Sequence, residues 1–67
     1  SGYRFVAWLG AQANPQAFKD ICPHALPLIE GKDFKAPHVD WKALYGISSR
    51  GGVLVRPDGY VCARISD

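Results

Sequence analysis

Two cysteines and two histidines are the residues of this chain whose side chains could act as nucleophiles, redox groups or metal ligands. Cys22 and Cys62 stand forty positions apart, and His24 and His38 lie beside prolines. The four could supply a zinc ion with ligands, but Cys22-Pro23-His24 lacks the paired spacing of structural zinc sites. We therefore expect no metal site, and no neighbouring residue indicates acid–base chemistry for either histidine.

The two cysteines are interpreted as reduced thiols in the core, because free cysteine is among the residue types most often buried. A disulfide between Cys22 and Cys62 is the main alternative, although a disulfide scaffold of 67 residues normally has several bridges. A catalytic pair of Cys22 with His24 is unsupported, since short chains often place one cysteine near one histidine by chance. We therefore expect no catalytic residue in this chain.

Length and composition predict one small packed domain. The chain has 67 residues, of which 48% are hydrophobic and 21% charged, so it has material for a single core. Eight basic and six acidic residues give a net charge of +2, and the basic residues are scattered. Such weak charge predicts no binding to nucleic acid or to a membrane, and no stretch approaches the roughly 20 apolar residues of a membrane span. Without a signal-peptide pattern, the chain is expected to be soluble and cytoplasmic.

The first part of the sequence predicts a strand followed by a helix. Residues 3–9 are aromatic and branched with one charge, which is typical of a strand buried on both faces. Asn14 and Pro15 favour a helix start, as N-cap and first helical residue. Pro23 predicts that this helix kinks or ends near Cys22. Its apolar stripe is expected to pack on a sheet and consists of Ala17, Phe18, Ile21 and Cys22.

The middle of the sequence predicts a weak strand and a short helix. Residues 27–39 are the least regular part, and we expect one short edge strand at one of its ends, because edge strands tolerate proline. Asp40 favours the start of a second helix and Gly46 its end. The inward stripe of this helix is expected to be Trp41, Leu44 and Tyr45. Trp8 and Trp41 are interpreted as core residues and not as a ligand platform.

A β-hairpin is the clearest pattern in the sequence. Residues 53–56 and 60–65 are strand-like runs joined by Pro57, Asp58 and Gly59. Proline presets the backbone for a type I turn, and glycine suits the left-handed position that closes a three-residue loop. The sequence therefore predicts an antiparallel hairpin at the end of the sheet.

The loop length fixes the register of this hairpin. We expect three cross-strand pairs, which are Arg56 with Tyr60, Val55 with Val61, and Leu54 with Cys62. Arg56 could pair with Asp58 or with a carboxylate of another domain, since its guanidinium can bind one through two N–H groups. The hairpin motif is thus the candidate site for an interdomain contact, and its residues are Arg56, Pro57, Asp58, Gly59 and Tyr60.

The expected order of elements is β-α-β-α-β-β, which is an α/β fold. A parallel crossover followed by an antiparallel hairpin predicts a thioredoxin-like three-layer sandwich. In redox-active proteins of this fold the thiols lie where the first strand meets its helix. Residues 10–15 contain no cysteine, so the chain alone is expected not to be an enzyme. The alternative is a stand-alone thioredoxin-like thiol oxidoreductase that uses Cys22 or Cys62.

The hairpin and the residues before it form a motif with a known counterpart. Residues 45–47 are Tyr-Gly-Ile, and residues 51–61 are Gly-Gly-Val-Leu-Val-Arg-Pro-Asp-Gly-Tyr-Val. This run resembles the C-terminal segment of FAD-dependent aromatic hydroxylases, the group that includes phenol 2-monooxygenase. The family's closing hairpin has a hydrophobic strand, Arg-Pro-Asp-Gly or a close variant, and then Tyr or His before Val. The resemblance is specific over residues 45–61 and architectural over residues 3–40, and residues 62–64 depart from the family's usual continuation.

The resemblance implies that residues 1–67 are a non-catalytic C-terminal thioredoxin-like accessory or dimerisation domain of a longer flavoprotein, an aromatic-ring monooxygenase. FAD and NAD(P)H are implied for the parent oxidoreductase but no cofactor for this chain, because Gly51-Gly52 lacks the third glycine of a dinucleotide fingerprint. The implied partners are the catalytic flavin-binding part and a second copy in a homodimer. A complete domain of this fold closes with another helix after the hairpin. We therefore expect one hairpin face to be exposed or covered by another chain.

Overall fold

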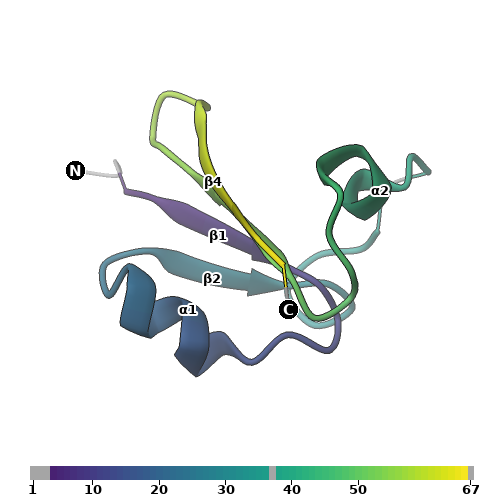
Figure 1. Ribbon diagram of the computed structural model, residues 1–67, viewed down its shortest axis with the longest axis horizontal. Coiled ribbons are helices and arrows are strands. Elements are labelled where there is room, and N and C mark those ends of the chain that lie inside the picture. The colour runs from purple at the N-terminus through teal and green to yellow at the C-terminus, as the bar shows by residue number, and fades with distance from the viewer. Residues whose placement is uncertain (1–3, 37, 67) are drawn as a thin grey trace.

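The computed structural model describes residues 4–36 and 38–66, which form one four-stranded sheet and two helices (Figure 1). The elements in chain order are β1 (Val6–Leu9), α1 (Pro15–Ile21), β2 (Leu26–Ile29), α2 (Trp41–Tyr45), β3 (Gly52–Val55) and β4 (Val61–Ile65). The α/β class and the order of elements are those that the sequence predicts. Tyr3, which the sequence assigns to the first strand, lies outside the described residues.

The sheet is mixed and has the strand order β2-β1-β3-β4. β1 pairs with β2 in parallel, while the β1–β3 and β3–β4 pairs are antiparallel. β2 is therefore an edge strand, as expected for this region, and it accommodates Pro27 because an edge strand has one side without ladder hydrogen bonds. Figure 1 shows α1 on one face of the sheet and α2 on the other side, near one end of the strands.

The ends of α1 follow from its capping residues. The side chain of Asn14 accepts the N–H of Gln16 at 3.1 Å, and Pro15 is the first helical residue. At the other end the N–H of Cys22 bonds to the carbonyl of Phe18, and the helix stops before Pro23. The helix thus ends where the sequence places a proline and does not kink through it.

Only part of the predicted stripe of α1 faces the core. Phe18 is buried and Cys22 packs against the core, but Ala17 is exposed and Ile21 is 59% exposed. Successive helical residues are about 100° apart, so Ala17 and Ile21 lie on the same side of Phe18. On that side Ala17 borders an open hollow of about 270 Å³ that Ile65 also lines. The prediction that Ala17 and Ile21 pack on the sheet is therefore wrong.

The core lies between α1 and the sheet. Its buried cluster consists of Ala7, Leu9, Phe18 and Ala25. Gly52 makes this packing possible, because a Cβ there would lie 2.5 Å from Leu9 Cδ2 and 2.7 Å from Phe18 Cε1. The first glycine of β3 thus lets the Phe18 ring approach the strand backbone.

The short helix α2 is also bounded by its caps. Asp40 Oδ1 accepts the N–H of Ala43 at 3.3 Å, and Gly46 ends the helix in the left-handed conformation with φ +68°. Trp41 and Tyr45 are half-buried, but Leu44 is 72% exposed, so its predicted inward position is wrong. A helix of five residues has little more than one turn, so few of its side chains can face the sheet. Trp41 and Tyr45 occupy that side of the helix. Within the described residues, neither helix is long and apolar enough to span a membrane.

The hairpin has the predicted loop but a different register beyond it. The N–H of Arg56 bonds to the carbonyl of Tyr60 at 2.8 Å, and Val55 pairs with Val61, as expected. Leu54 then pairs with Ala63 and not with Cys62, because the ladder shifts at a β-bulge.

The bulge decides which side chains of β4 face the core. Val61 lies on the face of Val55, whereas Ala63 and Ile65 pair with residues of the opposite face. Cys62 is the extra residue and is exposed, so its predicted place in the core is wrong. Both cysteines are free thiols, which excludes the alternative of a disulfide in this structure, and Cys22 is partly buried.

Candidate functional site

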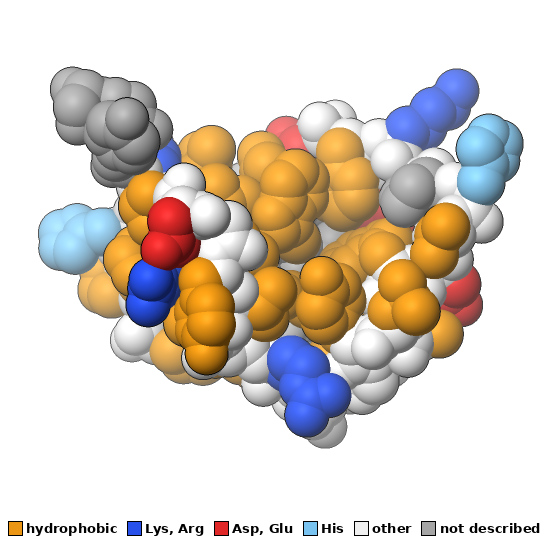
Figure 2. Space-filling model, turned by 90° about the horizontal axis from the view of Figure 1, so that it is seen from above, with side chains coloured by type: hydrophobic (Ala, Val, Ile, Leu, Met, Phe, Trp, Pro, Cys, Tyr) orange, Lys and Arg blue, Asp and Glu red, His pale blue; other side chains and the backbone are white. Residues whose placement is uncertain are grey.

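The face of the sheet opposite α1 contains an apolar hollow of about 380 Å³. Figure 2 looks onto this face and shows apolar side chains gathered around its middle. The hollow lies on one face of the β3–β4 hairpin. The sequence predicts that one hairpin face is exposed or covered by another chain, and this face is partly open in the single chain. The residues that line it are Trp8, Phe34, Trp41, Tyr45, Val53, Val55, Gly59 and Val61.

The floor of the hollow is set by strand register. Trp8 of β1 pairs directly with Val53 of β3, so the two side chains project from the same face. Val55 follows two residues after Val53 on that face, and the bulge keeps Val61 beside Val55. Val53 is only 2% exposed.

One wall of the hollow comes from the turn that follows β2. Gly31 takes φ +86°, and its N–H bonds to the carbonyl of Phe34 at 2.7 Å. The carboxylate of Asp33 accepts the N–H of Ile29 at 2.8 Å, which closes the turn. These bonds bring Phe34 back beside the end of β2 and toward Trp8.

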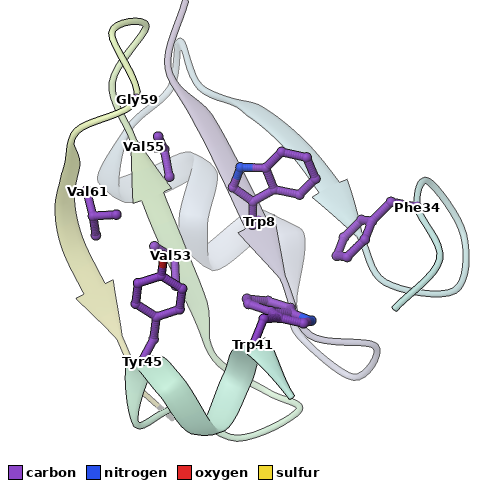
Figure 3. A pocket seen from close by; sticks show the side chains of 8 residues that line it. All are labelled: Trp8, Phe34, Trp41, Tyr45, Val53, Val55, Gly59 and Val61. Carbon is purple, nitrogen blue, oxygen red and sulfur yellow. The ribbon is translucent and has the colours of Figure 1, made fainter. Parts of the chain in front are cut away.

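Three aromatic rings form a continuous cluster along this wall (Figure 3). Trp8 and Phe34 meet edge to face with ring centroids 5.0 Å apart, and Phe34 and Trp41 meet at 5.9 Å. Both tryptophans are half-buried and line the hollow, so the expectation that they are core residues holds only in part.

One carboxylate, that of Glu30 at the end of β2, binds two residues of α2. Glu30 Oε1 accepts the indole N–H of Trp41 at 2.7 Å and the ammonium of Lys42 at 3.0 Å. These two hydrogen bonds, with the charge of Lys42, hold the pKa of Glu30 below its usual value. Lys42 also lies 5.7 Å from the centroid of the Trp41 ring, within the range of a cation–π contact.

Two polar groups border the hollow without a hydrogen-bond partner within the described residues. They are the indole N–H of Trp8 and the hydroxyl of Tyr45. Figure 3 shows the nitrogen edge of Trp8 turned toward Val55 and the Tyr45 hydroxyl turned toward Val53. Both groups are therefore available to a molecule in the hollow.

The residues of the predicted hairpin site form a tip next to the hollow, and several local contacts join them. Arg56 binds Asp58 through two hydrogen bonds, of 2.5 Å and 3.3 Å, and its guanidinium lies 4.7 Å from the centroid of the Tyr60 ring. Asp58 also accepts the N–H of Tyr60 at 3.1 Å. The hydrogen bond between them raises the pKa of Arg56 and lowers that of Asp58. Gly59 turns the loop with φ +90°, and Pro57 precedes Asp58 in it.

The two cysteines and the two histidines do not form a cluster within the described residues. His24 and His38 are exposed in turns, and Cys62 is exposed on β4. Among residues 4–36 and 38–66, no three His, Cys, Asp or Glu side chains are grouped closely enough to hold a metal ion. Cys22 lies at the C-terminal end of α1, opposite to the helix N-terminus, where the pKa of a thiol is lowered.

Comparison with known proteins finds no family model, no curated protein and no solved structure that matches this chain. Sequence reasoning identified the hairpin tip but missed the hollow and its residue Phe34. The only signal was a set of aromatic residues in separate segments, and which of them meet depends on sheet order.

Proposed function

We propose that this chain is a non-catalytic thioredoxin-like accessory domain that packs on the flavin-binding part of an FAD-dependent aromatic-ring monooxygenase. A parallel β1–β2 crossover followed by the antiparallel β3–β4 hairpin supports the thioredoxin-like part of the proposal. The motif of residues 45–61 supports the choice of parent enzyme.

The observation that carries the proposal is the preformed hairpin tip. Arg56 is held by Asp58 and stacked on Tyr60, while Tyr60 itself is 61% exposed. Arginine and tyrosine are enriched among the residues that dominate protein–protein binding. Their fixed arrangement lowers the conformational entropy that binding would otherwise cost. The tip also projects beyond the rest of the sheet (Figure 1), where a partner surface can reach it.

The geometry favours this binding role over a thiol oxidoreductase. The junction of β1 and α1 has no cysteine, since residues 10–15 are Gly-Ala-Gln-Ala-Asn-Pro. Cys22 follows the far end of α1, and Cys62 lies on the edge strand β4. Neither thiol is at the helix N-terminus, where a thiolate would be stabilised.

The first experiment is to isolate the natural polypeptide that contains this chain. We expect a mass several times that of 67 residues, bound flavin visible by absorbance, and a dimer in sedimentation. A natural product with only this domain and no flavin would contradict the assignment to a monooxygenase.

A second experiment tests the tip itself. The flavin-binding part is prepared without residues 1–67, and its binding to the separate 67-residue chain is measured by calorimetry. We expect Arg56→Ala and Tyr60→Ala each to weaken binding at least about tenfold, as for central interface residues. Lys19→Ala, which removes an exposed cation on α1, is the matched control and should bind like the wild type. Equal affinities for all four chains would remove the tip from the interface.

A further inference from the structure

We propose that the aromatic hollow binds a neutral aromatic molecule of one or two rings that carries a hydrogen-bonding group. This site lies beside the hairpin tip but uses other side chains, so the proposal goes beyond the accessory role and does not depend on it.

Size and lining favour a small molecule. A volume of about 380 Å³ lies near the lower end of the range of small-molecule sites, about 300–1,000 Å³. The hollow is closed on one side by the Phe34–Trp41 wall and on the other by the hairpin loop at Gly59 (Figure 3). It is therefore a recess in the sheet face and not a flat patch.

The walls select an aromatic ring. Trp8, Trp41 and Tyr45 each contribute an aromatic ring to the lining, while Val53 and Val61 supply an aliphatic floor. A flat ring placed there can meet these rings edge to face or in an offset stack, the geometries that aromatic pairs prefer. A saturated ring of the same size would fill the space but would lose these contacts.

The polar edge defines the second feature of the ligand. The indole N–H of Trp8 can donate to an oxygen, and the hydroxyl of Tyr45 can donate or accept. A phenol-like hydroxyl can accept from the indole N–H or exchange a hydrogen bond with the hydroxyl of Tyr45. A few directed polar groups in an apolar lining are the usual source of orientation in ligand sites.

The electrostatics favour a neutral ligand. None of the residues that line the hollow is charged. Lys42 on the wall is paired with Glu30, and Arg56 at the tip is paired with Asp58. Arg64, which pairs with Val53 across the β3–β4 ladder, does not line the hollow and donates to the carbonyl of Tyr45 at 3.1 Å. An ionised ligand in the hollow would therefore lose its hydration with no charged side chain among the lining residues.

The test is a titration of the ¹⁵N-labelled 67-residue chain with 2-naphthol, followed through the indole N–H signals of Trp8 and Trp41. We expect saturable shifts with a dissociation constant on the order of 1 mM or lower. The saturated analogue 2-decalol and the anion naphthalene-2-sulfonate should each bind at least about tenfold more weakly.

Two variants locate the site and protect the test against misfolding. Trp8→Leu should weaken 2-naphthol binding at least about tenfold. Tyr45→Phe keeps the ring and should weaken 2-naphthol about fivefold while leaving naphthalene unchanged, because only the hydroxyl is lost. Tyr60→Phe, on the tip, is the matched control and should leave both affinities unchanged.

Three outcomes would overturn the proposal. One is the absence of saturation up to the solubility limit of 2-naphthol. Another is equal affinity for 2-naphthol in the wild type, in Tyr45→Phe and in Trp8→Leu. The third is a shift of the indole N–H signals that grows with protein concentration in the absence of ligand. Such a shift would show that a second copy of the chain fills the hollow.

Discussion

The carboxylate of Glu30 binds the indole of Trp41, eleven residues later, at 2.7 Å, and so joins the end of the β2 edge to α2. Lys42 adds an ion pair to the same carboxylate at 3.0 Å. The Phe34–Trp41 ring contact and a hydrogen bond from Arg64 to the carbonyl of Tyr45 also hold α2, which has five residues and an exposed outer side. The aromatic wall of the hollow thus depends in part on Glu30, which itself lies outside the lining.

Removal of this carboxylate should loosen α2. We expect Glu30→Ala to lower the free energy of unfolding by about 1–2 kcal/mol, because the indole N–H of Trp41 loses its acceptor in a part-buried place. Urea denaturation followed by circular dichroism measures the change. Asp20→Ala, which removes an exposed carboxylate bonded to Gln16 on α1, is the control and should cost less than about 0.5 kcal/mol. Equal costs would mean that the Glu30 bonds do not stabilise the fold.

The same contact should make stability depend on pH in acid. The pKa of Glu30 is lower in the folded chain, so its stabilising effect is complete above the usual glutamate value of about 4.3 and is lost as pH falls through the folded pKa. Glu30→Gln keeps an acceptor for Trp41 but not the charge, and should be about 1 kcal/mol less stable at pH 7. The gap between the two proteins should narrow as pH falls below the usual glutamate value and through the lowered pKa of Glu30. The pKa of Asp58 is also lowered, and it affects both proteins equally, so only the difference in stability between them reports on Glu30. A difference that stays constant with pH would contradict the role of the Glu30 charge.

The sequence predicts the local structure of this chain well because its signals are local. Asn14 and Asp40 cap the helices they precede, and Gly59 takes the left-handed turn position, each through contacts within three residues. Burial of Ile21 and Leu44 was predicted wrongly, because periodicity shows which residues share a helix face and not whether another element covers that face.

The candidate site was harder to predict because it depends on contacts between distant segments. The pairing of Arg56 with Asp58 follows from their spacing, and the hairpin tip was found from sequence. The approach of Trp8 to Phe34 depends instead on β2 lying beside β1 and on the turn at Gly31. The spacing of Trp8 and Phe34 in the sequence does not predict this contact.

Two glycines should differ in the cost of an added methyl group. A Cβ at Gly52 meets the flexible ends of Leu9 and Phe18, so Gly52→Ala should lower the free energy of unfolding by about 1–3 kcal/mol. A Cβ at Gly10 would overlap the backbone carbonyl of Ser49, which also accepts the N–H of Gln12. Gly10→Ala should therefore cost more than Gly52→Ala in parallel urea denaturation. The reverse order would show that the loop at Ser49 moves more easily than the core.

The thiols should react without catalysing exchange. Cys62 is exposed and Cys22 partly buried, so a chromogenic disulfide reagent should modify Cys62 faster in the native chain. Insulin reduction with a dithiol donor should proceed at the uncatalysed rate, and Cys22→Ser and Cys62→Ser should leave it unchanged. Turnover that either substitution abolishes would favour the oxidoreductase over the accessory domain.

The bulge in β4 can be tested by comparing two of its side chains. In the bulged register Ile65 packs against the core while Cys62 is exposed and its thiol lies 3.4 Å from the carbonyl of Leu54. Ile65→Ser should thus lower the free energy of unfolding by about 1–2 kcal/mol, and Cys62→Ser should change it by less than about 0.5 kcal/mol. A regular hairpin would exchange these roles, because Cys62 would pair with Leu54 on the α1 face and Ile65 would move to the other face. A larger cost for Cys62→Ser than for Ile65→Ser in urea denaturation would therefore favour the regular register and would place different side chains against both α1 and the hollow.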